Sequence, residues 1–195
     1  MGLVHLYCGD GKGKSTAAAG LALRMAGCGK QAVICRFLKN DCSGEAEALS
    51  RTENVVVIPA AGDFGFTWNM TPEVKAEAAR ANRSMFRNAV ETVDFLLQKV
   101  DRSENAVDDA LTGRDALSAE VLLVLDEACA AVNTGMIPLE ELTGFLDRRP
   151  AGLEVVLTGR NPAEELVVRA DYMTEFRKRK HPYDRGIRAR YGVEY

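Results

Sequence analysis

A glycine- and lysine-rich turn near the start of the chain constrains its fold more than any other segment. Residues 4–16 read VHLYCGDGKGKST, in which an apolar stretch enters the turn, and a predicted small-residue helix, Thr16–Ala26, follows it. Strand, glycine loop and helix in this order form phosphate sites. The glycines let backbone N–H groups point inward, and the helix N-terminus adds partial positive charge. The sequence therefore predicts a nucleoside triphosphate site here.

The residues of this loop suggest separate roles. Lys14 would bring a full charge to the phosphates, and Ser15 would offer its hydroxyl to a magnesium ion. The pattern G-x-x-x-x-G-K-[ST] would place glycine where the chain has Cys8, and the dinucleotide pattern G-x-G-x-x-G fails because Lys14 stands at its third glycine. A glycine-rich surface turn is the alternative, which the flanking strand and helix disfavour. The residues expected to bind the nucleotide are Gly9, Asp10, Gly11, Lys12, Gly13, Lys14, Ser15 and Thr16.

Composition narrows the class of protein. The length of 195 residues predicts one domain over residues 1–195. The net charge of −3 predicts no general attraction to nucleic acid or membranes. Five cysteines without a C-x-x-C pair suit a reduced cytoplasm, and two histidines are too few for a histidine-based metal cluster. Met1 leads directly into the first predicted strand, so we expect no signal peptide, and no apolar run approaches ~20 residues. We expect a cytoplasmic protein.

Apolar, β-branched runs alternate with helical patterns along the chain. This alternation predicts an α/β fold of the P-loop NTPase type, with a mostly parallel sheet flanked by helices in a single domain. The expected strands are Leu3–Tyr7, Ala32–Phe37, Val55–Ile58, Val121–Leu125 and Leu153–Leu157, with further candidates at Tyr172–Phe176 and Tyr191–Tyr195.

One long helix is expected between the third and fourth of these strands. Thr71-Pro72-Glu73 is a good helix start, and apolar residues then recur every three or four positions up to Val100. Met85 and Phe86 on this stripe are expected in the core rather than in a ligand site. The polar segment 101–119 carries both charge signs and is expected to be an inserted loop.

Two acids follow the most apolar run of the chain. Residues 121–125 read VLLVL and lead into Asp126 and Glu127. The carboxyl end of a parallel strand would bring these carboxylates to the edge of the sheet that also holds Ser15, so Ser15, Asp126 and Glu127 are the expected ligands of Mg²⁺. The alternative is that Asp126 only caps the next helix.

Three other segments have candidate roles. Arg160 follows another predicted strand and would contact the nucleotide, or else be an exposed turn residue. Residues 62–68, GDFGFTW, hold three aromatics, which could form a platform for a planar ligand or a plug packed under the loop. Residues 177–190 carry seven Lys and Arg against Asp184 alone, a patch that could meet phosphates or could be a solvated tail.

Together these segments resemble the ATP:corrinoid adenosyltransferases of the CobA/BtuR type. The resemblance runs in order through GDGKGKST (9–16), FLK (37–39), SGE (43–45), GFTW (65–68), VLDEA (124–128), EVVLTGR (154–160) and residues 170–195. The family's loop begins at the residue that matches Gly9, so the absence of glycine at position 8 fits the family.

The resemblance implies a reaction in which a Co(I) corrinoid, such as cobalamin, attacks the 5′ carbon of ATP and triphosphate leaves. ATP would be held in the reverse sense to most phosphate-loop enzymes. Lys14 would stabilise the leaving group, Arg160 would contact the nucleotide, and Phe66 and Trp68 would pack against the lower face of the corrin and displace its axial ligand. A four-coordinate Co(II) ion is easier to reduce. The resemblance further implies reduced flavin or a flavin-type electron-donor protein as partner, and a homodimer.

The chain departs from the family pattern in three places. Asp10 stands where the family often has asparagine, the 101–119 insert has no counterpart, and the sequence begins without the N-terminal extension that closes over the corrinoid in some members. Two other functions are also considered. One is a conventional phosphate-loop kinase or ATPase, which would release ADP, and the other is a non-catalytic, ATP-gated corrinoid carrier or sensor.

Overall fold

Six parallel strands form the central layer of the chain. The computed structural model describes residues 2–39, 43–104 and 119–193, and the order of strands across the sheet is β3-β2-β4-β5-β1-β6. The strands are β1 (Val4–Cys8), β2 (Gln31–Arg36), β3 (Val55–Val57), β4 (Val121–Asp126), β5 (Leu153–Thr158) and β6 (Tyr172–Glu175). Because every pairing is parallel, all six carboxyl ends lie along one edge of the sheet.

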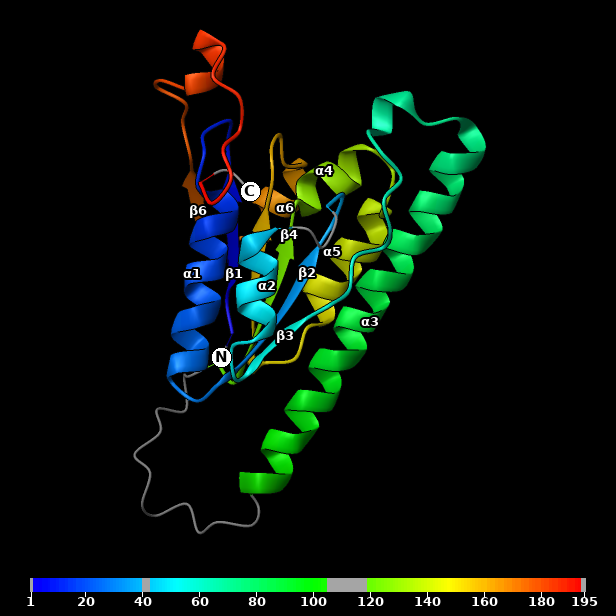
Figure 1. Cartoon of the computed structure of the whole chain (residues 1–195). Coiled ribbons are helices and arrows are strands. Elements are labelled where there is room, and N and C mark those ends of the chain that lie inside the picture. The colour runs from blue at the N-terminus through cyan, green and yellow to red at the C-terminus, as the bar shows by residue number, and fades with distance from the viewer. Residues whose placement is uncertain (1, 40–42, 105–118, 194–195) are drawn as a thin grey trace.

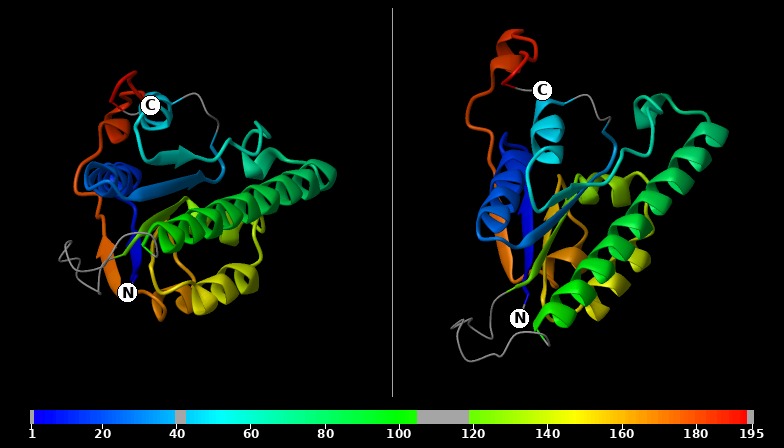
Figure 2. Two further views of the ribbon diagram at one scale, coloured as in Figure 1. Left: turned by 90° about the horizontal axis from the view of Figure 1, so that it is seen from below. Right: turned by 60° about the horizontal axis from the view of Figure 1, so that its bottom comes forward.

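Helices cover both faces of the sheet, as the alternating sequence pattern predicted. Helices α1 (Lys14–Gly27) and α2 (Gly44–Ser50) pack on one face, and α3 (Pro72–Glu104), α4 (Ala128–Asn133), α5 (Leu139–Arg148) and α6 (Glu164–Val167) lie on the other (Figures 1 and 2). The central strand β4 is buried along its whole length, which explains its unbroken run of Val and Leu. The chain is thus one α/β domain with a P-loop-like sheet.

The long helix predicted after Thr71 is confirmed. Helix α3 has 33 residues, begins at Pro72 and buries Met85 and Phe86 in the core. It continues through Glu104, four residues into the segment expected to be a loop, because polarity alone does not end a helix and residues 101–104 contain neither Gly nor Pro. Residues 105–118 lie outside the described residues.

The expected strands are confirmed with boundary shifts of at most one residue, with one exception. The predicted strand Tyr191–Tyr195 is wrong for its described part, because residues 191–193 form a turn in which Gly192 has φ 74°. Its apolar alternation imitates a strand, but a left-handed glycine cannot continue one. The first helix also begins at Lys14 rather than Thr16. Within the described ranges, no helix combines the length and apolar character needed to span a bilayer.

Candidate functional site

The glycine loop lies between β1 and α1, at the carboxyl edge of the sheet. Gly9 and Gly13 have φ angles of 101° and 114°, in the left-handed region that favours glycine. The chain that follows the neighbouring strand β6 packs against this loop. Phe176 N donates to Cys8 O at 2.8 Å, and Gly11 N donates to Phe176 O at 2.6 Å.

This close approach requires glycine. An ideal Cβ at Gly9 would lie 2.4 Å from Phe176 O, and one at Gly11 would lie 2.7 Å from the same oxygen. We therefore expect Gly9→Ala to lower the free energy of unfolding by about 2–4 kcal/mol, from backbone strain and overpacking together. Urea unfolding measures this. The matched control is Gly20→Ala on the exposed face of α1, where a Cβ has no neighbour within 4 Å and alanine should stabilise by up to about 1 kcal/mol. Equal effects of the two changes would contradict the packing role of Gly9.

Lys14 is held inside the loop. Its Nζ donates to the carbonyl oxygens of Gly9 and Gly11, each at 2.8 Å, and the residue is 8% exposed. Burial lowers the pKa of Lys14 below its usual value, and the nearby Arg160 guanidinium lowers it further. Because this ammonium is buried and bonded to carbonyl oxygens, an anionic ligand in the loop would bind close to a charge that has little water around it.

Asp126 lies deep at the end of β4, 3% exposed. Its Oδ1 accepts a hydrogen bond from Thr158 Oγ1 at 2.6 Å, and the Thr158 oxygen in turn accepts from Glu127 N at 2.9 Å. Burial alone would raise the pKa of Asp126, but the Lys39 ammonium and hydrogen bonds from Lys39, Thr158 and Ser15 outweigh it and lower that pKa. The carboxylate is therefore held in its charged form.

The helix-cap alternative for Asp126 is wrong. The residue at the cap position of α4 is Glu127, with φ 60°, and α4 has no side-chain cap hydrogen bond. The carboxylate of Asp126 instead bonds across the sheet to β5 and to the first turn of α1. A left-handed residue directly after a buried strand is costly for a side chain other than glycine, and such strain tends to gather at functional sites.

The three expected metal ligands come together in part. Ser15 and Asp126 both contact the Lys39 ammonium, and Glu127 lines the same cavity as Ser15. A hydroxyl and two carboxylates are hard oxygen donors of the kind Mg²⁺ prefers, so the residues fit that ion. In the part of the chain that the structure describes, no group of three or more His, Cys, Asp or Glu side chains could hold a metal by itself. This suits an ion that takes its remaining ligands from phosphate oxygens and water.

Lys39 lies at the site, and sequence reasoning assigned it no role. Its Nζ donates to Ser15 Oγ at 3.0 Å and forms an ion pair with Asp126 Oδ2. The segment FLK (37–39) was part of the family resemblance and follows a predicted strand at the same edge, and this was the only signal that could have pointed to it.

A cavity of about 1080 Å³ opens above the loop. Turns after β2, β4 and β5 and the C-terminal segment surround it. All the expected nucleotide-binding residues line it except Gly9, which lines a neighbouring hollow of about 410 Å³, while Asp126 lies buried behind it. The predicted residues around the cavity are Asp10, Gly11, Lys12, Gly13, Lys14, Ser15, Thr16, Glu127 and Arg160, and residues not predicted as site residues include Arg36, Lys39, Ser43, Glu45 and His181.

Arg160 is exposed but faces the site. It lines both hollows, and its charge contributes to the lowered pKa of Lys14 and of Asp10. It follows Gly159, whose φ of 149° turns the chain beneath the loop, against Cys129. The position is that of a side chain able to reach phosphates in the loop.

Residues 176–193 rise over the glycine loop (Figure 1). Asp10 Oδ1 accepts a hydrogen bond from Lys178 N at 2.9 Å, and Lys12 Nζ donates to Val193 O at 3.1 Å. The Lys178 hydrogen bond is the main reason why the pKa of Asp10 is lowered. We refer to residues 176–193 as the C-terminal cover. Sequence reasoning did not predict it, because the segment is polar and has no periodicity.

Removing the Asp10 contact should loosen the C-terminal cover. We expect Asp10→Ala to speed tryptic cleavage within residues 177–190 several-fold, and Asp10→Asn to do so less, because an amide oxygen still accepts the Lys178 N–H bond. Mass spectrometry of the fragments over time measures the rate. Asp63→Ala is the matched control, since Asp63 is also exposed and accepts a backbone hydrogen bond, from Gly65 N at 3.0 Å. Unchanged cleavage of Asp10→Ala would show that the contact does not hold the cover.

The basic residues of this segment are partly paired with acids. Arg177 Nη2 lies 2.7 Å from Glu175 Oε2, and Lys178 Nζ lies 3.0 Å from Asp184 Oδ1. The cover is thus more than a run of like charges, although most of its side chains are exposed. Its His181 and Val193 line the cavity over the loop.

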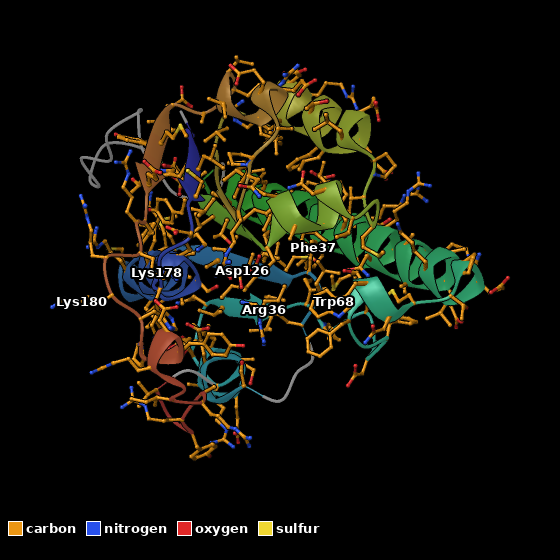
Figure 3. The ribbon with its side chains drawn as sticks, turned by 90° about the horizontal axis from the view of Figure 1, so that it is seen from above. Arg36, Phe37, Trp68, Asp126, Lys178 and Lys180 are labelled. Carbon is orange, nitrogen blue, oxygen red and sulfur yellow. The ribbon has the colours of Figure 1, made fainter. Side chains whose placement is uncertain are left out.

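Phe66 and Trp68 form an exposed aromatic pair. They are 65% and 75% exposed, and their rings stack with centroids 4.6 Å apart at 12°. The plug alternative is wrong for both, because only Phe64 of this loop packs against the core. The 3-10 turn η1 (Thr67–Asn69) carries Trp68. In Figure 3, which looks down on the carboxyl edge, Trp68 and Lys178 lie on opposite sides of Asp126.

Comparisons with known proteins cover the whole chain. The family model described as "ATP:corrinoid adenosyltransferase BtuR/CobO/CobP" matches residues 1–195. The chain is 30% identical over 194 residues to "Corrinoid adenosyltransferase CobA" of Salmonella typhimurium (strain LT2), a match that covers 100% of this chain and 86% of that protein. It is 32% identical over 196 residues to a "Corrinoid adenosyltransferase" of Sinorhizobium sp, covering 100% and 80%. It is also 29% identical over 194 residues to one of Escherichia coli (strain K12), covering 100% and 86%.

Proposed function

Because this chain belongs to the ATP:corrinoid adenosyltransferases of the BtuR/CobO/CobP family, we propose how its own residues carry that activity. It is an enzyme whose substrates are ATP and a corrinoid. It transfers the 5′-deoxyadenosyl group of ATP to cobalt. The Co(I) electron pair forms the cobalt–carbon bond, and the C5′–O bond breaks with its electron pair on triphosphate. The full-length family match, joined to a phosphate loop on the sheet edge that also carries the exposed aromatic pair, is the observation that supports this best.

The phosphate loop serves the leaving group in this proposal. The departing triphosphate gains negative charge, and Lys14, Arg160 and those loop N–H groups that are not bonded within the protein are among the positive groups around the cavity that can stabilise it. Stabilising a leaving group in a site with fixed dipoles lowers the barrier without any protein nucleophile.

The thiols near the loop support this division of roles. Cys8 and Cys129 are both buried, and burial raises the pKa of Cys8 above its usual value and that of Cys129 to about 12. Protonated, buried thiols are poor nucleophiles. The corrinoid cobalt itself is the nucleophile, so the site needs to hold and orient ATP rather than attack it.

An ATP-using family indicates a divalent metal, and we propose Mg²⁺ held by Ser15, Asp126 and Glu127. When bound, the ion would neutralise charge on the triphosphate oxygens. The Thr158 hydroxyl fixes Asp126, and Glu127 N fixes Thr158, so these two hydrogen bonds orient the carboxylate toward Ser15.

We place the corrinoid over Phe66 and Trp68. Two large rings that stack on each other and remain exposed offer a flat apolar surface to a planar ligand. Packed beneath the corrin, they would displace its lower axial ligand and make Co(II) easier to reduce to Co(I). The electron would come from reduced flavin or a flavin-type donor protein.

We further propose that the enzyme is a homodimer of the cytoplasm. The described cysteines, Cys8, Cys28, Cys35 and Cys129, are free thiols, which is typical of proteins in a reducing compartment. Light scattering of the purified chain measures the oligomeric state.

The product of ATP tests the function. Incubated with ATP, Mg²⁺ and a chemically reduced corrinoid, the protein should yield a light-sensitive alkylcobalt spectrum and one triphosphate per corrinoid. ADP and orthophosphate without an alkylcobalt product would instead indicate a conventional ATPase or kinase. Tight binding of both substrates without any product under strong reduction would indicate a carrier. The comparisons favour neither alternative.

A further inference from the structure

An ammonium group lies between two expected ligands of the metal. Lys39 Nζ donates to Ser15 Oγ at 3.0 Å and pairs with Asp126 Oδ2, so one ammonium contacts both groups. A phosphate-loop serine and a strand-end aspartate are the two groups between which a metal ion bridges to the phosphates of a nucleotide. The cation that contacts both of these groups in the structure is the Lys39 side chain.

Local backbone geometry brings Lys39 to this position. Strands β2 and β4 are in register with Arg36 opposite Asp126, and Phe37 N donates to Asp126 O at 3.0 Å. Leu38 then has φ 55°, a left-handed conformation that is strained for a leucine. This turn sends Lys39 back toward Asp126, and strain at such a place points to a function for the residue that follows.

Charge explains why a cation is needed there. Asp126 is 3% exposed, and a carboxylate so deeply buried needs a positive partner. The Lys39 side chain is 29% exposed and lines the nucleotide cavity, so it can leave Asp126 for the cavity without any rearrangement of the core.

We propose, on the basis of the metal site proposed above, that Lys39 is a tethered cation that fills the metal position when no nucleotide is bound. Metal-bound ATP displaces its ammonium from Asp126, and the ammonium then turns to the triphosphate in the cavity. The nucleotide-free enzyme consequently excludes free divalent metal, and metal and nucleotide bind together. Lys39 is thus a positioning residue for the metal and becomes a contact of the leaving group.

Binding of Mn²⁺ to the nucleotide-free protein tests this, with the free ion measured by electron paramagnetic resonance. If Lys39 holds the site at least nine-tenths of the time, Lys39→Met should bind Mn²⁺ about tenfold more tightly than the wild type, or better. Adding Asp126→Asn to Lys39→Met should abolish the gain. With ATP present, the difference between wild type and Lys39→Met should narrow, because the phosphates attract the displaced ammonium.

Lys30→Met is the matched control. Lys30 also pairs with a carboxylate beside β2 and β4, Glu120 at 3.3 Å, but at the opposite ends of these strands. The Lys30→Met variant should bind Mn²⁺ with the same affinity as the wild type. If Lys39→Met fails to fold, Lys39→Gln, which removes the charge but keeps a donor for Asp126, should show the same gain.

Mn²⁺ affinity of a folded, neutral Lys39 variant equal to or weaker than that of the wild type would overturn the proposal. A purely structural ion pair would change thermal stability in Lys39→Met without changing metal affinity. The measurement involves no corrinoid and no turnover. A negative Mn²⁺ result would therefore overturn the role of Lys39 but not the proposed adenosyl transfer. Release of ADP in the product assay would overturn adenosyl transfer but not the Mn²⁺ result.

Discussion

Replacing Lys14 by alanine is expected to lower the rate of adenosyl transfer by roughly 10²–10³-fold, the usual loss when one preorganised contact to a developing negative charge is removed. The ammonium is buried in the loop, 2.8 Å from two carbonyl oxygens, where little water could replace it. The initial rate of alkylcobalt formation from chemically reduced Co(I) corrinoid, at saturating ATP, measures the effect.

The control for this change is Lys30→Ala. Lys30 is also partly buried and also donates to a carbonyl oxygen, that of Ala119, but it lies at the opposite edge of the sheet. It should retain nearly full activity. Circular dichroism and thermal unfolding must show that Lys14→Ala is folded. A folded Lys14→Ala protein with a rate close to that of the wild type would refute the role of Lys14 at the leaving group.

Trp68→Ala is expected to reduce turnover from a Co(II) corrinoid by about tenfold more than turnover from the pre-reduced Co(I) form, in line with the loss of one aromatic contact. The reason is that the proposed role of Trp68 is to displace the axial ligand before reduction, a step that pre-reduced cobalt bypasses. Parallel assays with an enzymatic reductant and with a strong chemical reductant separate the two.

Phe95→Ala serves as the control for Trp68. Phe95 is likewise an exposed aromatic, with Lys99 Nζ 4.5 Å from its ring centroid, and it lies in the C-terminal half of α3 rather than in the loop that holds Trp68. Its removal should affect both assays little. Equal losses for Trp68→Ala with Co(II) and Co(I) would contradict the axial-ligand argument, and would leave Trp68 as a general binding contact.

The sequence predicted those parts of the fold in which one local rule suffices. Strand β4 is buried on both faces, so its apolar composition alone identifies it. The glycine loop is identified by its sequence pattern between a strand and a helix. The strand predicted at Tyr191–Tyr195 failed because Gly192 at φ 74° breaks an otherwise strand-like alternation.

The residues that sequence reasoning missed depend on tertiary placement. Lys39 reaches Asp126 through the register of β2 against β4 and the left-handed turn at Leu38. Neither feature can be predicted from the residue types in this segment. The C-terminal cover depends on hydrogen bonds over very long sequence separations, such as Asp10 to Lys178. Ser15 and Asp126 could be predicted because each follows a strand at the same edge, which is a rule of topology rather than of contact.

The C-terminal cover has a consequence for the order in which this protein matures. Residues 10–12 are held by Phe176, Lys178 and Val193, so segments far apart in the sequence meet at the glycine loop. A ribosome releases residues 10–12 long before residues 176–193, and domains gain their long-range contacts only when both partners have emerged. The nascent chain therefore carries its glycine loop uncovered until the C-terminal cover has been made. Any change that prevents residues 176–193 from being made or from docking would leave the glycine loop without these contacts.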